Sequence, residues 1–196
     1  IDIAGNPAKW DNVQPEFSAY RGNTRHRDYD GYRDPETKEH IHYVNNTGRN
    51  DICGAKVARD NDNLYFLVKT ADPLTNSKDP AWMRLFLEIG GRENAPAWET
   101  FQYVVNRQAP GDTTALLEKS EGGWNWTAVG EVDYTVQGNL LQIKIPKKLL
   151  DIEGDNFTVN FKWADNTQKD GDIMDFYVSG DVAPLGRFKY QYNAKA

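Results

Sequence analysis

Two tryptophans stand where a flat aromatic ring can meet a ligand. Trp82 follows residues 79–81 at the junction of a loop with a strand, and Trp98 lies in a loop beside residues 95–97. The C–H face of a pyranose stacks on such a ring, while its hydroxyl groups bond to charged or amide groups. The pair therefore predicts an exposed carbohydrate platform. Packing of both indoles beneath their own loops is the alternative.

Polar residues that follow a strand end supply the second half of such a site. Asp165 and Asn166 come just after Trp163, which closes a row of alternating apolar side chains and is expected in the core. A carboxylate and an amide leaving the strand can bond to sugar hydroxyls, so both are candidate binding residues. Trp124 and Trp126 share one face of another strand, and they are expected in the core or, alternatively, as an exposed pair.

Aspartates around Gly171 have the chemistry of a calcium site. Asp170, Asp172 and Asp175 offer carboxylate oxygens on one segment, and calcium takes six to eight oxygen ligands on flexible loops. The spacing does not match an EF-hand, so a solvated acidic turn is the alternative.

Two histidines have a weaker metal signal. His40 and His42 flank Ile41 and would share one strand face, as in some zinc sites. No third ligand follows at a telling distance, so an ordinary polar strand edge is the favoured interpretation.

Motifs of common enzymes are absent. The chain contains no HExxH, no Gly-x-Ser-x-Gly and no glycine-rich phosphate loop. Paired carboxylates for glycoside cleavage stay open, because a sequence does not give their separation. The sequence favours a domain without catalysis of its own.

Short strands must position all of these residues. In residues 53–57 apolar side chains alternate with Gly54 and Lys56, and a strand-like run at 64–70 follows the turn at 60–63, so the two segments predict a hairpin. No segment sustains an apolar 3.6 period. We expect one all-β domain over residues 1–196, an antiparallel two-sheet β-sandwich of the immunoglobulin or jelly-roll kind. Further hairpins are expected from residues 114–119 with 124–129 and 132–136 with 140–145, one helical turn at 147–150, and strands at 157–163 and 188–192.

One segment breaks the strand pattern. Residues 18–39 are rich in arginine and aspartate and predict one long N-terminal surface loop. Long ordered loops on a sandwich carry function or cover a sheet edge.

Composition excludes several classes of partner. The net charge of −6 and the isoelectric point near 5.1 disfavour nucleic acid, whose phosphates need clustered Lys and Arg. No apolar run approaches the ~20 residues needed to span a bilayer. Cys53 is the single cysteine, so an internal disulfide is excluded and a small buried apolar role is expected.

A series of short motifs runs along nearly the whole chain. It begins with a hydrophobe, Asp and Gly before Trp10, and continues with the Asn-Leu-Tyr entry to the strand at 64–70. It then comprises Trp82 before a strand, the Gly-Asn-Leu entry at 138–140, and the closing Gly-Arg-Phe at 186–188. In this order the motifs are similar to those of the family 9 carbohydrate-binding modules and the related DOMON-type sandwiches.

The resemblance implies a β-sandwich that binds oligo- or polysaccharide, as an accessory domain of a secreted, periplasmic or cell-surface polysaccharide-degrading enzyme. It places Trp82 at one wall of an aromatic sandwich around the sugar. Arg84 then occupies the position of a polar contact, and Arg107 lies near that of a cationic one. Residues 179–185, where the family has its second wall, include no aromatic residue.

Two other functions stay open. The chain could be a structural domain that packs on a catalytic partner through exposed aromatic residues. DOMON-type sandwiches also hold haem between Met and His, and this chain has those ligand types, although without a recognisable haem spacing. The candidate ligands are Met83, Met174, His26, His40 and His42.

Overall fold

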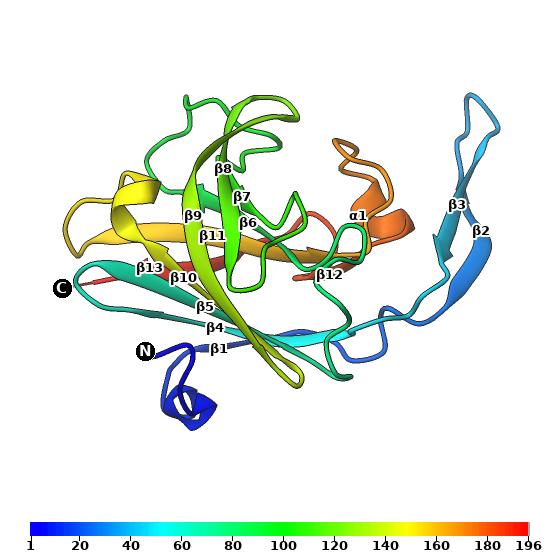
Figure 1. Ribbon diagram of the computed structural model, residues 1–196. Coiled ribbons are helices and arrows are strands. Elements are labelled where there is room, and N and C mark those ends of the chain that lie inside the picture. The colour runs from blue at the N-terminus through cyan, green and yellow to red at the C-terminus, as the bar shows by residue number, and fades with distance from the viewer. Residues whose placement is uncertain (196) are drawn as a thin grey trace.

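The chain folds almost entirely into antiparallel strands. The computed structural model describes residues 1–195, and Figure 1 shows one large curled sheet from which a small two-stranded sheet projects. The strands are β1 (Glu16–Ser18), β2 (Arg27–Arg33), β3 (His40–Asn45), β4 (Ile52–Arg59), β5 (Asn63–Thr70), β6 (Arg84–Ile89), β7 (Tyr103–Val105), β8 (Thr114–Gly122), β9 (Asn125–Gln137), β10 (Leu140–Pro146), β11 (Phe157–Asp165), β12 (Asp181–Ala183) and β13 (Tyr190–Ala194). The helices are η1 (Pro7–Trp10), η2 (Lys147–Leu150) and α1 (Asp175–Val178).

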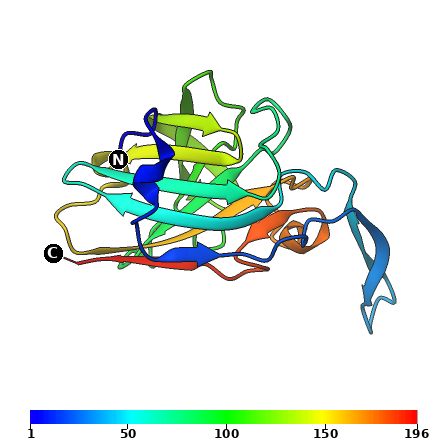
Figure 2. The same cartoon turned by 90° about the horizontal axis from the view of Figure 1, so that it is seen from below.

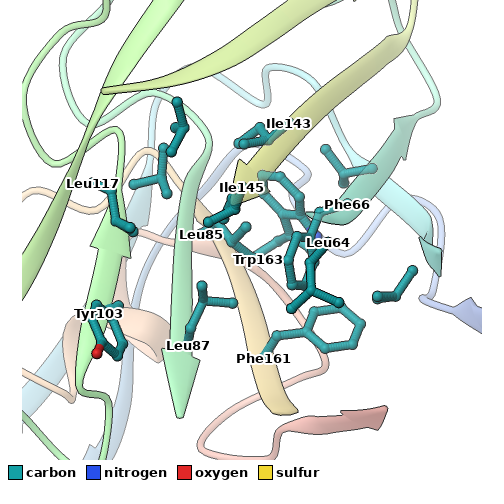
Figure 3. Packing of buried hydrophobic residues seen from close by; sticks show 14 of the residues in the cluster. Leu64, Phe66, Leu85, Leu87, Tyr103, Leu117, Ile143, Ile145, Phe161 and Trp163 are labelled. Carbon is teal, nitrogen blue, oxygen red and sulfur yellow. The ribbon is translucent and has the colours of Figure 1, made fainter. Parts of the chain in front are cut away.

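The large sheet folds over so that its two halves pack face to face. Its strand order is β1-β4-β5-β10-β9-β8-β7-β6-β11-β12, and β13 pairs with β11 on the same edge as β12, beside the earlier part of the strand. The all-β sandwich is thus confirmed, with one continuous sheet forming both layers. Alternate side chains of the two halves meet in the main core, as Phe66 of β5 and Phe161 of β11 do at 5.7 Å between ring centroids. Figure 3 shows this packing, with Trp163 fully buried at its centre as predicted.

The predicted hairpins are confirmed, with one difference. β4 pairs with β5, β8 with β9, and β9 with β10. β9 is a single strand of 13 residues, whereas the sequence favoured two strands at 124–129 and 132–136. Register shifts opposite Leu117 and Ser120 let it continue without a break, because bulges bend a strand while keeping its pairing.

Two smaller apolar clusters lie outside the main core. Trp10 of η1 packs on the outer face of β5 and donates its Nε1–H to the Gln142 side chain at 2.7 Å. The second cluster covers the outer face of β6, β7 and β11 with aromatic rings and includes Phe176 of α1. None of the helices within residues 1–195 is long and apolar enough to cross a membrane.

The N-terminal loop expected at residues 18–39 is interrupted by a strand. Residues 27–33 of this segment form β2, which pairs with β3 in a hairpin that stands away from the sandwich (Figures 1 and 2). Tyr29 lies opposite Tyr43, with ring centroids 5.5 Å apart. Asp28 and Asp30 lie on the face opposite Tyr29, and residues 27–33 do not sustain the apolar and polar alternation that identifies a half-buried strand.

Candidate functional site

Trp82 is not an exposed platform. Only 2% of its surface is accessible, and the indole packs in the main core against Tyr134, with ring centroids 6.3 Å apart. Ala81 and Met83 on either side both have positive φ angles, 51° and 39°. This double turn directs the indole between the two halves of the sheet, so no face of Trp82 is left for a sugar.

Trp98 is also buried, at 5% accessible surface. It packs in the outer-face cluster between Phe86 and Phe176 and contacts Trp124 edge-on at 4.5 Å between centroids. Trp124 and Trp126 are half-buried at the margin of the same cluster, in a T-shaped contact. Trp98 is therefore packed beneath its own loop and is not an exposed platform, and its indole anchors that loop over the sheet.

The two arginines implied by the resemblance hold ion pairs within the protein. Arg84 is buried and its Nη1 donates to Asp170 at 2.6 Å and to Thr167 at 3.2 Å. Arg107 forms a two-pronged pair with the buried carboxylate of Glu118, at 2.9 and 2.6 Å. Both guanidinium groups are thereby neutralised and oriented inside the fold.

Asp165 and Asn166 lie at the hairpin end of the sandwich but serve different contacts. Asp165 is fully buried and accepts hydrogen bonds from Arg49, Asn50 and the Met83 amide. Asn166 donates to the Ser179 carbonyl and borders a small hollow of about 250 Å³ beside Arg49. Asp165 is structural, and only Asn166 adjoins a surface hollow.

The three aspartates of the predicted calcium site are not brought together. Asp170 pairs with Arg84, and Asp172 accepts from the Met174 amide at 2.9 Å. Asp175 is buried and accepts from the amide of Lys169 and from the Ser179 hydroxyl. Within residues 1–195, no group of three or more His, Cys, Asp or Glu side chains could hold a metal ion.

The histidines of the suggested zinc site have carboxylate partners. His42 Nδ1 lies 2.7 Å from Asp30 and its Nε2 lies 2.5 Å from Asp28, whereas His40 Nδ1 lies 3.4 Å from the Gly31 carbonyl. Hydrogen bonds to the two carboxylates raise the pKa of His42 above its usual 6.5. Both ring nitrogens donate only in the imidazolium form, so the geometry fits a charged His42.

We expect an NMR titration to give His42 a midpoint above pH 6.5, and Asp30→Asn to lower that midpoint. The pKa is raised in the folded state, so the hairpin gains stability from these pairs below about pH 6.5 and loses it as the pH rises through the raised pKa. Asp34→Asn is the matched control, since Asp34 bonds to its own turn. If Asp30→Asn left the titration midpoint of His42 unchanged, the result would contradict the pairing of His42 with Asp30.

The haem ligand types are also dispersed. Met83 is fully buried in the main core, whereas Met174 is exposed beside α1. His26, His40 and His42 are exposed on the hairpin and the segment that leads into it.

One hollow with exposed aromatic walls lies between the hairpin and α1. Its volume is about 350 Å³, within the ~300–1,000 Å³ typical of small-molecule sites. Tyr29 is 56% exposed and Tyr177 is 39% exposed, so both rings face solvent. The residues that line this hairpin cleft are Asn23, Arg27, Tyr29, Tyr43, Phe176, Tyr177, Gly180, Val182, Leu185 and Gly186.

Two glycines let the tyrosine rings lie close to the backbone. The ring of Tyr43 lies across Gly31 on the neighbouring strand, where a Cβ atom would overlap it. Gly186 has a φ of 59°, and a Cβ atom there would stand 2.6 Å from the Tyr177 hydroxyl oxygen. Since both rings need these positions to stay without side chains, the walls of the hairpin cleft have a defined shape.

Arg27 and Asn23 form the polar part of the hairpin cleft. Arg27 Nε donates to the Val178 carbonyl at 3.2 Å, and Nη1 donates to the Asn23 carbonyl at 3.3 Å. Its Nη2 donates to the carbonyls of Tyr177 and Gly180. The guanidinium group thus ties β2 to α1. The Asn23 Oδ1 atom is buried and has no hydrogen-bond donor, which is unusual for an amide oxygen.

Asp181 lies buried behind the cleft on β12. It accepts from the Ile52 amide at 2.8 Å, and its other oxygen has no donor. Burial raises its pKa to about 8, against the lowering effect of the Ile52 hydrogen bond, and the charges of Asp165 and Asp51 raise it further. Asp181 is therefore mostly protonated at neutral pH.

Asp181→Asn is expected to stabilise the chain increasingly as the pH rises. The unfolded carboxyl ionises near its usual 3.8, whereas the folded one keeps its proton to about pH 8, so the free energy of unfolding falls between these values. The stability difference between variant and unaltered chain should grow by up to ~1.4 kcal/mol per pH unit. Urea unfolding across this range measures it, with exposed Asp112→Asn as control. A difference independent of pH would contradict a protonated Asp181.

A larger hollow of about 500 Å³ lies between the β4–β5 turn and the segment around η2. Both segments are at the end of the sandwich away from the hairpin (Figure 1). Turn residues 61–63 and residues 146–155 border it, and no aromatic ring lines it. Lys147 and Asp155 form an ion pair at its rim. Its chemistry is that of a solvated turn region.

The tyrosines of the hairpin cleft were not predicted as site residues from the sequence. Tyr29 and Tyr43 lie in the segment expected to be a loop or polar edge, and Tyr177 follows the aspartates assigned to calcium. The one available signal was the spacing of Tyr29, Gly31, Ile41 and Tyr43, which fits cross-strand pairing. Searches of the chain against protein-family models, curated proteins and solved structures found no match.

Proposed function

We propose that this chain is a non-catalytic domain that binds a saccharide in the hairpin cleft. The observation that carries the proposal is the pair of partly exposed tyrosine rings, Tyr29 and Tyr177, on opposing elements of the cleft beside Arg27 and Asn23. A sugar ring offers an apolar C–H face and a rim of hydroxyls. The cleft supplies the matching aromatic surface and polar groups.

The polar groups match a hydroxyl in particular. The partnerless Asn23 Oδ1 needs a hydrogen-bond donor, and a hydroxyl both donates and accepts. A guanidinium group has five N–H donors and Arg27 uses four of them within the protein. One hydroxyl donating to Asn23 and one oxygen accepting from Arg27 would satisfy both groups.

The resemblance to family 9 modules supports the same function at a different place. It puts one aromatic wall at Trp82 and the other in residues 179–185. In this structure Trp82 is buried in the main core. Gly180, Val182 and Leu185 of that segment line the hairpin cleft, and Tyr177 precedes it. In this proposal the tyrosines replace the tryptophan walls, and the domain accompanies a secreted or cell-surface enzyme that degrades polysaccharide.

Titration calorimetry of the intact chain with a panel of soluble oligosaccharides tests the proposal. We expect at least one to bind, with competition by the free sugar but not by unrelated polyols. Gly186→Ala should weaken that binding, because the new Cβ would displace Tyr177. Gly91→Ala, at a glycine of similar φ with open space around it, is the matched control. A chain that binds no member of a broad panel would contradict the proposal.

A second candidate is an accessory domain that packs on a protein partner. Tyr20 is 75% exposed and Phe188 is 78% exposed, which is unusual for aromatic residues of this size. Tyr20 lies just beyond β1 and Phe188 just before β13. The Tyr190 hydroxyl of β13 donates to the Ser18 carbonyl of β1 at 2.7 Å, which connects the two strands. Tight association with the rest of its parent protein, lost in Phe188→Ser, together with no saccharide affinity, would favour this function.

A further inference from the structure

The charge of Arg27 is the starting point, because no carboxylate balances it. All four hydrogen bonds of its guanidinium group end on backbone carbonyls, of Val178, Asn23, Tyr177 and Gly180. Carbonyls offer partial charges but no net negative charge. Among the described residues, no Asp or Glu lies within ion-pair distance of Arg27.

Three other enclosed arginines of this chain have carboxylate partners, whereas half-buried Arg92 resembles Arg27 in donating to backbone carbonyls, those of Leu150 and Asp151. Arg49 pairs with Asp165, Arg84 with Asp170 and Arg107 with Glu118, each at 2.8 Å or less. The chain has 29 acidic residues, so carboxylates that could pair with an arginine are plentiful. The absence of one at Arg27, within the part of the chain that the structure describes, leaves a cationic group at a surface hollow.

The residues around the hairpin cleft do not neutralise the charge of Arg27. None of the residues that border it between Asn23 and Gly186 is acidic. Asp28 and Asp30 of the same hairpin point their carboxylates at His42, on the opposite strand face from Tyr29 and Tyr43. Asp181, the carboxyl behind the cleft, is near enough for the charge of Arg27 to lower its pKa, but burial outweighs this effect and raises the pKa to about 8, so the carboxyl is mostly uncharged at neutral pH. The hollow is therefore a positive spot on a chain with a net charge of −6.

We infer that the ligand of the hairpin cleft is an acidic saccharide, whose uronate carboxylate binds the remaining N–H of Arg27 while a neighbouring hydroxyl donates to Asn23 Oδ1. This inference rests on the proposed function and narrows its ligand class. A carboxylate on a guanidinium group forms a charge-assisted bond, about twice as strong as a neutral one. The tyrosine walls take the apolar face of the same sugar ring.

Pairs of ligands that differ only in charge test the inference on the unaltered chain. Oligogalacturonate, oligoglucuronate and oligomannuronate are each titrated beside the same oligosaccharide after reduction of its carboxyl groups. For at least one pair we expect the acidic form to bind about tenfold more tightly. That preference should shrink as salt is raised, because added ions screen an exposed charge pair.

Variants locate the effect. Arg27→Gln should abolish the preference for the acidic form, whereas Arg25→Gln removes the same charge from an exposed neighbour outside the cleft lining and should keep it. Arg27 ties β2 to α1. If Arg27→Gln therefore does not fold, the salt dependence of binding by the unaltered chain decides whether a charge pair holds the ligand. Equal affinity for both members of every pair would overturn the inference and leave the proposed function standing. Binding of neither would overturn both.

Discussion

Replacing Tyr29 and Tyr177 together with alanine is expected to weaken saccharide binding about 100-fold. Each ring offers a partly exposed face to the hairpin cleft, from β2 and α1 respectively. Stacking on one aromatic ring contributes roughly 1.5 kcal/mol, so the loss of both walls removes about 3 kcal/mol. Titration calorimetry with the best oligosaccharide of the panel measures the change.

The control for this pair is Tyr32→Ala. Tyr32 is an exposed tyrosine of the same hairpin and does not line the cleft. We expect its replacement to leave the affinity within twofold and the unfolding midpoint unchanged. Equal losses in Tyr32→Ala and in the double variant would show that the cleft is not the site.

Trp82→Ala is expected to destabilise the whole domain rather than a binding site. The indole lies in the main core beside Tyr134, and removal of a fully buried tryptophan costs about 3–5 kcal/mol. A domain of ordinary stability, ~5–15 kcal/mol, loses a large part of its margin through such a change. Urea unfolding monitored by circular dichroism gives the difference in free energy.

Tyr20→Ala gives the contrast for the core substitution. Its ring is exposed and should contribute less than ~0.5 kcal/mol to folding. If Trp82→Ala kept its unfolding free energy and lost only saccharide affinity, the indole would be a binding platform after all, and its buried position would be wrong.

The sandwich was predictable because its strands alternate over a buried face. Residues 64–70 and 157–163 place every second side chain in the main core, and Asp and Asn residues mark the turn between β4 and β5. Burial of one face fixes register, since a slip of one residue would expose the whole apolar set. Local pattern and tertiary structure agree at these strands.

The hairpin could not be recognised in the same way. Asp28 and His42 occupy one face of β2–β3 and Tyr29 and Tyr43 the other, so neither face has the composition of a core. The segment is stabilised at its root by long-range bonds from Arg27 to residues some 150 positions away. Sequence periodicity contains no information on such contacts.

The tryptophans show why the position of a ring at a strand end is hard to predict. Trp82 turns inward because Ala81 and Met83 adopt positive φ angles, and neither residue type signals that conformation. Trp98 is covered because Phe176, 78 positions later, packs against it at 5.8 Å between centroids. Both outcomes depend on the assembled fold.

The most direct test of saccharide binding in the hairpin cleft is an NMR titration of the labelled chain with the best oligosaccharide. We expect the largest amide shifts at Asn23, Arg27 and Tyr43 and in residues 177–186, with small shifts elsewhere. Shifts confined to the hollow at residues 146–155, or no shifts with any oligosaccharide, would contradict it.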